Sequence, residues 1–122
     1  MIFIIDDDKE LSDVVAKNMK VFAKKQGKEI SIRCFSDVIE AINATNEVRP
    51  SLVFLDILLN GPDGFTLLNE MQSYEDLAKV PIVIMSSLNF EIDKLLEYNV
   101  VKCLNKSLMT PEQIWDIVEE YE

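Results

Sequence analysis

The sequence predicts an α/β fold in which helices cover both faces of one parallel sheet, as a three-layer sandwich. Two observations predict it. Short apolar runs with the composition of buried strands alternate with segments of helical spacing along the whole chain, and five such pairs fit into its 122 residues. Right-handed crossover connections between parallel strands then place helices on both faces, which makes a doubly wound (βα)5 sheet.

Five segments are expected to form the strands. Residues 2–5, 52–55 and 82–85 are continuous apolar runs, which suits strands buried on both faces. Residues 29–35 alternate between polar and apolar side chains, as in a half-exposed strand, and residues 100–104 form the last strand. The expected strand order is 2-1-3-4-5, the flavodoxin-like order, whose switch point lies between the first and third strands.

Helical spacing and end signals follow each strand. The first helix should stop at Gly27, and its core-facing side should consist of Leu11, Val14, Val15, Asn18, Met19 and Phe22. Asp37 with Glu40 resembles a capping box for the second helix, and Thr110-Pro111 with Gln113 resembles one for the fifth. The third and fourth helices are marked by Phe65, Leu67, Leu68 and Met71 and by Ile92, Leu95 and Leu96.

Composition narrows the class of protein. The length suits one domain, so residues 1–122 are expected to form a single unit without an output domain. No apolar run approaches the roughly 20 residues of a membrane span, so no membrane insertion is expected. A net charge of −10 argues against nucleic-acid binding, because neutralising phosphates requires Lys and Arg. Cys34 and Cys103 are expected to be buried thiols in a reducing cytoplasm.

Polar residues stand where three of the apolar strands end. Asp6 and Asp7 follow the first strand, Asp56 follows the third and Ser86 follows the fourth, while Lys106 comes just after the last. Because the carboxyl ends of parallel strands line one crevice, these side chains should converge there.

The converging carboxylates predict a metal site. Three carboxylates in close proximity need a counter-charge, and a hard divalent cation such as Mg²⁺ (or Mn²⁺) prefers oxygen ligands. Asp7 and Asp56 are expected to be direct ligands, Asp6 to act through a metal-bound water, and Leu58 to offer its backbone carbonyl.

Asp56 is the expected nucleophile for a phosphoryl group. A carboxylate that attacks phosphorus needs its charge neutralised on approach and needs the equatorial phosphoryl oxygens stabilised. Lys106 offers an ammonium and Ser86 a hydroxyl for that purpose. The chain has no histidine, so no step can use a histidine of its own.

Taken together, these motifs resemble the receiver domain of a two-component response regulator, of the chemotaxis-like single-domain type. The matching residues are Asp6-Asp7-Asp8, Asp56 with Asp63-Gly64, Pro81 to Ser87, and Lys106. The resemblance implies that Asp56 accepts a phosphoryl group from a phosphohistidine of a sensor kinase or histidine phosphotransfer domain, with Mg²⁺. It also implies a signalling domain rather than an enzyme acting on other molecules, with a two-state shift that draws Ser86 to the phosphoryl group.

The resemblance further implies a downstream protein partner. Its expected contact face is the fourth helix, fifth strand and fifth helix, around Phe90, Tyr98 and Lys102. In such domains the side chains two residues past the acceptor and two past the switch hydroxyl flank the phosphoryl group. Here these are Leu58 and Leu88, which exclude water, so slow self-dephosphorylation is expected.

Several positions depart from the family pattern. Ser107 follows Lys106 where the family usually has proline, and a cis bond before a non-proline residue costs about 2.5–4 kcal/mol. Cys103 occupies the place of the switch aromatic, so an aromatic rotamer switch is not expected there. Asn60 stands where proline is usual, with Pro62 two residues on.

Two other functions remain open from the sequence. One is a non-phosphorylated pseudo-receiver that only binds partners, which the departures at Ser107 and Asn60 favour. The other is a small phosphatase of the haloacid-dehalogenase-like type, since Asp6-Asp7-Asp8 satisfies its strand-end motif, although Glu10 replaces the expected Thr or Val.

Overall fold

The computed structural model describes residues 1–58, 64–87, 95 and 97–122. Within these residues five strands form one parallel sheet in the order β2-β1-β3-β4-β5, as the sequence predicts. The strands are β1 (Ile2–Ile5), β2 (Ile32–Phe35), β3 (Leu52–Asp56), β4 (Ile82–Ser86) and β5 (Val100–Asn105). The described helices are α1 (Lys9–Lys25), α2 (Val38–Thr45), α3 (Gly64–Gln72) and α4 (Pro111–Tyr121).

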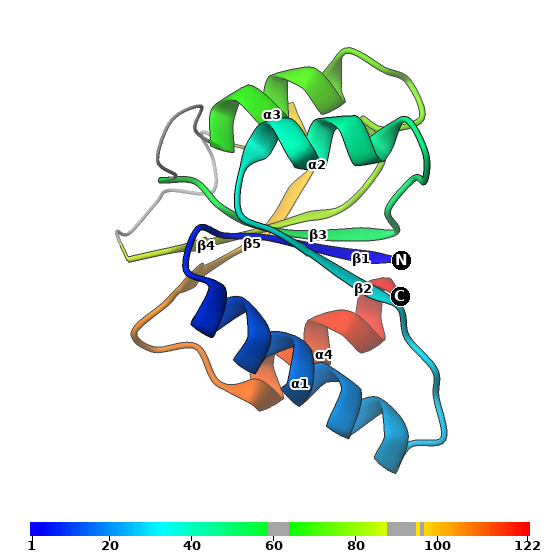
Figure 1. Cartoon of the computed structure of the whole chain (residues 1–122), viewed down its shortest axis with the longest axis vertical. Helices are drawn as coiled ribbons and strands as arrows, with labels where there is room; N and C mark the ends of the chain where they lie inside the picture. The colour runs from blue at the N-terminus through cyan, green and yellow to red at the C-terminus, as the bar shows by residue number, and fades with distance from the viewer. Residues whose placement is uncertain (59–63, 88–94, 96) are drawn as a thin grey trace.

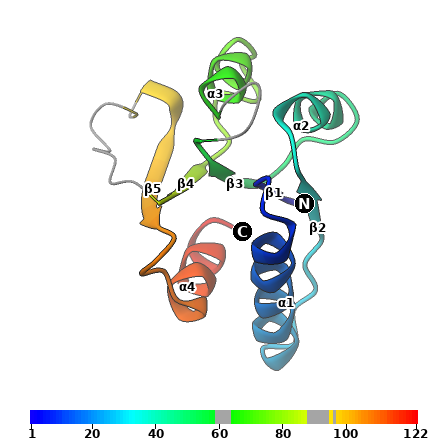
Figure 2. The ribbon, with the colours of Figure 1, turned by 60° about the vertical axis from the view of Figure 1, so that its left-hand side comes forward.

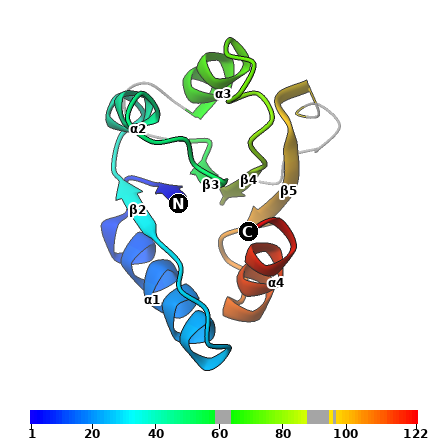
Figure 3. The same cartoon turned by 90° about the vertical axis from the view of Figure 1, so that its right-hand side faces the viewer.

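The sheet is the middle of three layers. Helices α1 and α4 lie side by side on one face, and α2 and α3 lie on the other (Figure 1). The turned views in Figures 2 and 3 show the same division, with the sheet between the two helix pairs. This is the flavodoxin-like α/β arrangement that the alternation of strands and helices predicts.

Alternate side chains of the central strands supply two separate cores. In β1, Phe3 and Ile5 join the core beneath α2 and α3, while Ile2 and Ile4 join the core beneath α1 and α4. All four side chains are at most 1% exposed. Burial on both faces explains why this strand is a continuous apolar run. No described helix is both long enough and apolar enough to cross a bilayer.

Local end signals place the helices. Asp8 caps α1 and Asp37 caps α2, each by accepting a hydrogen bond from the backbone N–H three residues on. Thr110 and Gln113 form the predicted capping box of α4. Gly27, with φ of 67°, follows the end of α1, where a left-handed residue commonly ends a helix.

Several local predictions are wrong. Strand β2 begins at Ile32 and not at residue 29, so its ladder with β1 spans only four residue pairs. Val14 is 54% exposed, because the buried positions of α1 are Ser12, Val15, Met19 and Ala23. Cys34 is exposed and Cys103 only half-buried, because β2 and β5 are the two edges of the sheet.

Some predicted features lie outside the described residues. These include most of the expected fourth helix and the positions Asn60, Pro62, Asp63, Leu88 and Phe90. Leu95, which the sequence assigns to that helix, is described and is 2% exposed. It belongs to the core beneath α2 and α3.

Candidate functional site

The carboxyl ends of three neighbouring strands bring the predicted polar residues together. Ile5 of β1 is paired with Leu55 of β3, so the next residues, Asp6 and Asp56, lie at the same level of the sheet, at its carboxyl end. Ser86 ends β4, the other neighbour of β3. Asp6, Asp56 and Ser86 are 1%, 4% and 1% exposed, so the structure buries three polar side chains at one end of the sheet.

Three carboxylates lie close together at this end of the sheet. One oxygen each of Asp6, Asp7 and Asp56 lies within 4.8 Å of the others. Asp7 lies nearer the surface than its two buried neighbours. An all-oxygen donor set of this density suits a hard divalent cation.

Lys106 supplies an ammonium group between the two buried carboxylates. Its Nζ lies 2.7 Å from Oδ2 of Asp6 and 2.9 Å from Oδ2 of Asp56. The β4–β5 pairing positions this side chain, since the Lys106 N–H donates to the Ser86 carbonyl at 2.9 Å. The bond to Ser107 is trans, and the ammonium still reaches both carboxylates without a cis bond.

Backbone N–H groups orient the other oxygen of each buried carboxylate. The Leu58 N–H donates to Oδ1 of Asp56 at 3.0 Å, and the Asp8 N–H donates to Oδ1 of Asp6 at 2.9 Å. In both cases the donor is two residues past the aspartate, a local turn that Asp side chains favour. Each carboxylate is therefore held on one side by its own loop and on the other by Lys106.

The charges at the site do not balance. Burial raises the pKa of Asp6, although its hydrogen bonds with Lys106 and with the Asp8 N–H act in the opposite direction. Burial alone would lower the pKa of Lys106, but the bonds and charges of Asp6 and Asp56 outweigh it and raise that pKa. Three carboxylates face one ammonium, so an added cation would relieve the repulsion.

Gly64, the first residue of α3, packs against Ile57, which directly follows Asp56. Its N–H donates to the Ile57 carbonyl at 3.1 Å, and a Cβ here would lie 2.8 Å from the Ile57 Cα. Only glycine fits without moving the backbone next to Asp56. The side chain of Leu58, two residues after Asp56, is 49% exposed.

The Asp6–Lys106 ion pair is a feature that the sequence did not suggest. Sequence reasoning assigned Lys106 to a phosphoryl oxygen and Asp6 to a metal-bound water, without linking the two residues. The link depends on the register of β5, which shifts by one residue between Ile82 and Val83. The sequence around Val101 carries no glycine or proline that signals this shift.

Comparison with known proteins assigns the family. The profile of the response regulator receiver domain matches residues 2–119. The chain therefore belongs to the receiver domain family of two-component response regulators, which is a signalling family rather than a class of true enzymes. This assignment does not favour the phosphatase alternative.

Solved structures agree with this assignment. A two-component response regulator from Clostridium difficile is 29% identical, with 98% of this chain and 93% of that chain covered and a TM-score of 0.73. The receiver domain of NtrX from Brucella abortus is 25% identical, with 99% and 97% covered and a TM-score of 0.76. The Mn²⁺-bound form of response regulator Rcp1 shares the fold at 22% identity, with 98% and 88% covered and a TM-score of 0.71.

Proposed function

We propose that residues 1–122 act as one receiver domain in which Asp56 accepts a phosphoryl group from a phosphohistidine of a partner protein. The observation that carries this proposal is the environment of the Asp56 carboxylate. It is buried, lies within 4.8 Å of two other carboxylates, and pairs with the Lys106 ammonium at 2.9 Å. Such an arrangement suits a nucleophile whose charge must be neutralised as it meets a phosphoryl group.

The transfer forms a bond between phosphorus and an oxygen of Asp56. The P–N bond of the donor breaks, and its imidazole leaves with the bonding electrons and takes up a proton. The Leu58 N–H and Lys106 hold the two Asp56 oxygens before the donor arrives, which lowers the entropic part of the barrier. After transfer, Lys106 and the Ser86 hydroxyl stabilise separate phosphoryl oxygens.

A divalent cation, Mg²⁺ or Mn²⁺, belongs to this proposal. Asp7, Asp56 and the Leu58 carbonyl would hold it directly, and Asp6 through a water. When bound, it supplies positive charge beside the phosphoryl oxygens. The crowded carboxylates and the raised pKa of Asp6 support this role, and so does the Mn²⁺-bound form of the structural neighbour Rcp1.

The proposed partners follow from the family. The donor is a sensor histidine kinase or a histidine phosphotransfer domain in the cytoplasm. The downstream partner is a protein that binds the face around Tyr98 and Lys102, next to β5 and α4. Lys102 is exposed on β5, the edge strand, where a partner can reach it.

The acceptor can be located chemically with a small donor that also carries a P–N bond. The protein is incubated with phosphoramidate and Mg²⁺, and the acyl phosphate is reduced with borohydride, which converts a phosphorylated aspartate to homoserine. Peptide sequencing should find homoserine at position 56 alone. Homoserine at position 6 or 7, or none with Mg²⁺ present, would contradict the assignment of Asp56.

A further inference from the structure

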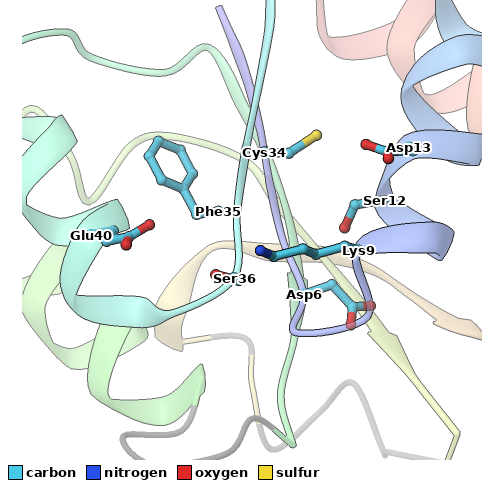
Figure 4. A pocket seen from close by; sticks show the side chains of 8 residues that line it. All are labelled: Asp6, Lys9, Ser12, Asp13, Cys34, Phe35, Ser36 and Glu40. Carbon is cyan, nitrogen blue, oxygen red and sulfur yellow. The ribbon is translucent and has the colours of Figure 1, made fainter.

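A second hollow lies beside the carboxylate site. It is a cavity of about 320 Å³ between the start of α1, the end of β2 and the start of α2. Its size suits a small organic ligand. Figure 4 shows the side chains that line it: Asp6, Lys9, Ser12, Asp13, Cys34, Phe35, Ser36 and Glu40. Asp56, Ser86 and Lys106 are not among them.

The charge of the lining favours a cation. Three lining side chains are acidic, namely Asp6, Asp13 and Glu40, while Lys9 is the one basic member. Because Asp6 is already paired with Lys106, the lining keeps an excess of one negative charge. A hollow lined mainly by one sign of charge concentrates ligands of the opposite sign.

Ser12 provides an independent sign of a missing ligand. The residue is 3% exposed, and among the described residues its Oγ has no hydrogen-bond partner. Figure 4 shows the hydroxyl directed from α1 toward Lys9, on the cavity side of the helix. Because buried hydroxyls are normally paired, a ligand N–H group that donates to this oxygen would satisfy it.

Lys9 does not fill the role of that ligand. Its side chain lies across the cavity in Figure 4, and within the described part of the chain it forms no ion pair. Lys9 is exposed, so its ammonium can move into solvent when another cation enters.

We propose that this cavity binds a small organic cation that carries a guanidinium group. A planar guanidinium offers five N–H donors, enough to pair with carboxylates on both sides of the cavity and with the Ser12 hydroxyl. Asp6 lines the cavity and also pairs with Lys106, so ligand binding and phosphoryl chemistry share one side chain. By thermodynamic linkage, phosphorylation of Asp56 should then change the affinity for the ligand by a certain factor. The bound ligand should change the equilibrium constant of phosphorylation by the same factor.

Cys34 gives a direct readout, because its exposed thiol lines the cavity. In a Cys103→Ser protein it is the only thiol. Methylguanidinium should slow the alkylation of Cys34 by iodoacetamide, with a saturable dependence and a Kd on the order of 1 mM for so small a probe. Neutral methylurea, and tetramethylammonium chloride at equal ionic strength, should leave the rate unchanged. Equal slowing by methylurea, or no slowing by methylguanidinium, would overturn the proposal.

Charge variants predict changes of opposite sign. Glu40→Gln should weaken methylguanidinium binding by roughly fivefold or more, since it removes a charged acceptor. Lys9→Met should tighten binding, because methionine has a side chain of similar length but lacks the ammonium that competes with the ligand. Glu47→Gln, an exposed acid near the end of α2 that does not line the cavity, should leave the affinity unchanged.

Amide NMR shifts repeat the test without any change to the cysteines. In the unmodified protein, methylguanidinium should shift the amide signals of Ser12, Cys34 and Ser36. Shifts confined to other parts of the chain, or the same Kd in the Glu40→Gln and Glu47→Gln variants, would assign the binding to the general acidity of the surface and refute the site.

Discussion

At the scale of the residue, the site is defined by an excess of negative charge, because three carboxylates lie close together beside the single ammonium of Lys106. Asp6 and Asp56 are buried at the carboxyl end of the sheet, and Lys106 neutralises only part of their charge. Their loops hold them in place through the N–H groups of Asp8 and Leu58. A fold that buries like charges loses stability unless a ligand compensates for them, which links stability to metal binding.

Removing the charge of Asp6 should stabilise the metal-free protein at pH 7. Burial raises the pKa of Asp6, so the folded state holds its proton to a higher pH than the unfolded state does. The ionised group therefore reduces stability as pH rises from the unfolded pKa through the raised folded pKa. Asp6→Asn should raise the melting temperature in EDTA by several degrees at pH 7, with less gain below pH 4. The exposed Asp116→Asn is the control, and a lower melting temperature for Asp6→Asn would refute this reading.

The leucines at positions 58 and 88 should make the phosphorylated state long-lived. Leu58 follows the acceptor by two residues and is half exposed, and Leu88 lies outside the described residues. Neither side chain can orient an attacking water. Leu58→Asn combined with Leu88→Glu should speed loss of the phosphoryl group by about tenfold, below the roughly 100-fold or more of a fully positioned base. Loss is followed by intact-protein mass after removal of the donor.

Leu108→Asn is the matched control for this decay measurement. Leu108 is 75% exposed in the loop before α4 and is not one of the site residues. Its substitution should leave the decay rate as in the wild type. Equal decay in the double variant and in Leu108→Asn would show that Leu58 and Leu88 do not exclude water.

At the scale of the element, the residues that directly follow β1 and β3 position the carboxylates, and close packing supports the end of β3. Gly64 is the clearest case, since it lies directly against the backbone of Ile57. Gly64→Ala should cost about 1–3 kcal/mol by overpacking and should slow phosphoryl uptake, because the backbone next to Asp56 must move. Urea unfolding measures the first effect and mass spectrometry the second.

Gly27→Ala is the control for Gly64→Ala, because it replaces a glycine that has no close neighbour. It therefore distinguishes the effect of packing at Gly64 from the effect of losing a glycine. A Cβ at Gly27 would meet nothing within 4 Å, although the φ of 67° disfavours alanine. It should cost about 1–2 kcal/mol through strain alone. It should leave phosphoryl uptake unchanged. If both variants slowed uptake equally, the packing of Gly64 would have no special role beside Asp56.

Elements whose signals are local were predictable from the sequence. The caps at Asp37 and Thr110 are set by residues three apart, and the strand order follows from alternation and handedness. The failures arise where tertiary context decides. The start of β2 depends on which residues meet β1, and Val14 was placed on the wrong face because helical spacing alone did not separate it from Val15.

The site could be predicted in part for the same reason. Asp6, Asp56 and Ser86 follow strands that the sequence marks clearly, so their convergence follows from topology. The pairing of Lys106 with Asp6 depends on the register shift in β5, and the cavity beside α1 depends on how three elements meet. Neither the ion pair nor the cavity is indicated by any pattern in the sequence.

At the scale of the whole molecule, two helix layers enclose the sheet (Figure 2), and buried polar residues gather at one end of that sheet. A cation bound there should stabilise the entire fold, because only the folded chain assembles the three carboxylates. Mg²⁺ at about 100 times its Kd should add roughly 2.7 kcal/mol to the free energy of unfolding. Thermal unfolding in Mg²⁺, against NaCl of equal ionic strength, measures this gain.

The variant Asp7→Asn tests whether the stabilisation by Mg²⁺ arises from binding at the proposed metal ligands. It should lose most of the Mg²⁺ effect while folding normally, since Asp7 is the least buried of the three carboxylates. Asp116→Asn should keep the full effect. A similar response of both variants to Mg²⁺ would indicate diffuse binding to a protein of net charge −10 instead of a site.

The role proposed for Asp56 is that of a metal-dependent phosphoryl acceptor. Its most direct test is the intact mass of the protein after incubation with acetyl phosphate, with Mg²⁺ or with EDTA, for wild type, Asp56→Asn and the exposed Asp116→Asn. We expect a gain of one phosphoryl group in wild type and Asp116→Asn, only with Mg²⁺, and none in Asp56→Asn. No gain in wild type, together with no Mg²⁺ binding, would contradict it and identify the domain as a pseudo-receiver that acts through constitutive protein contacts.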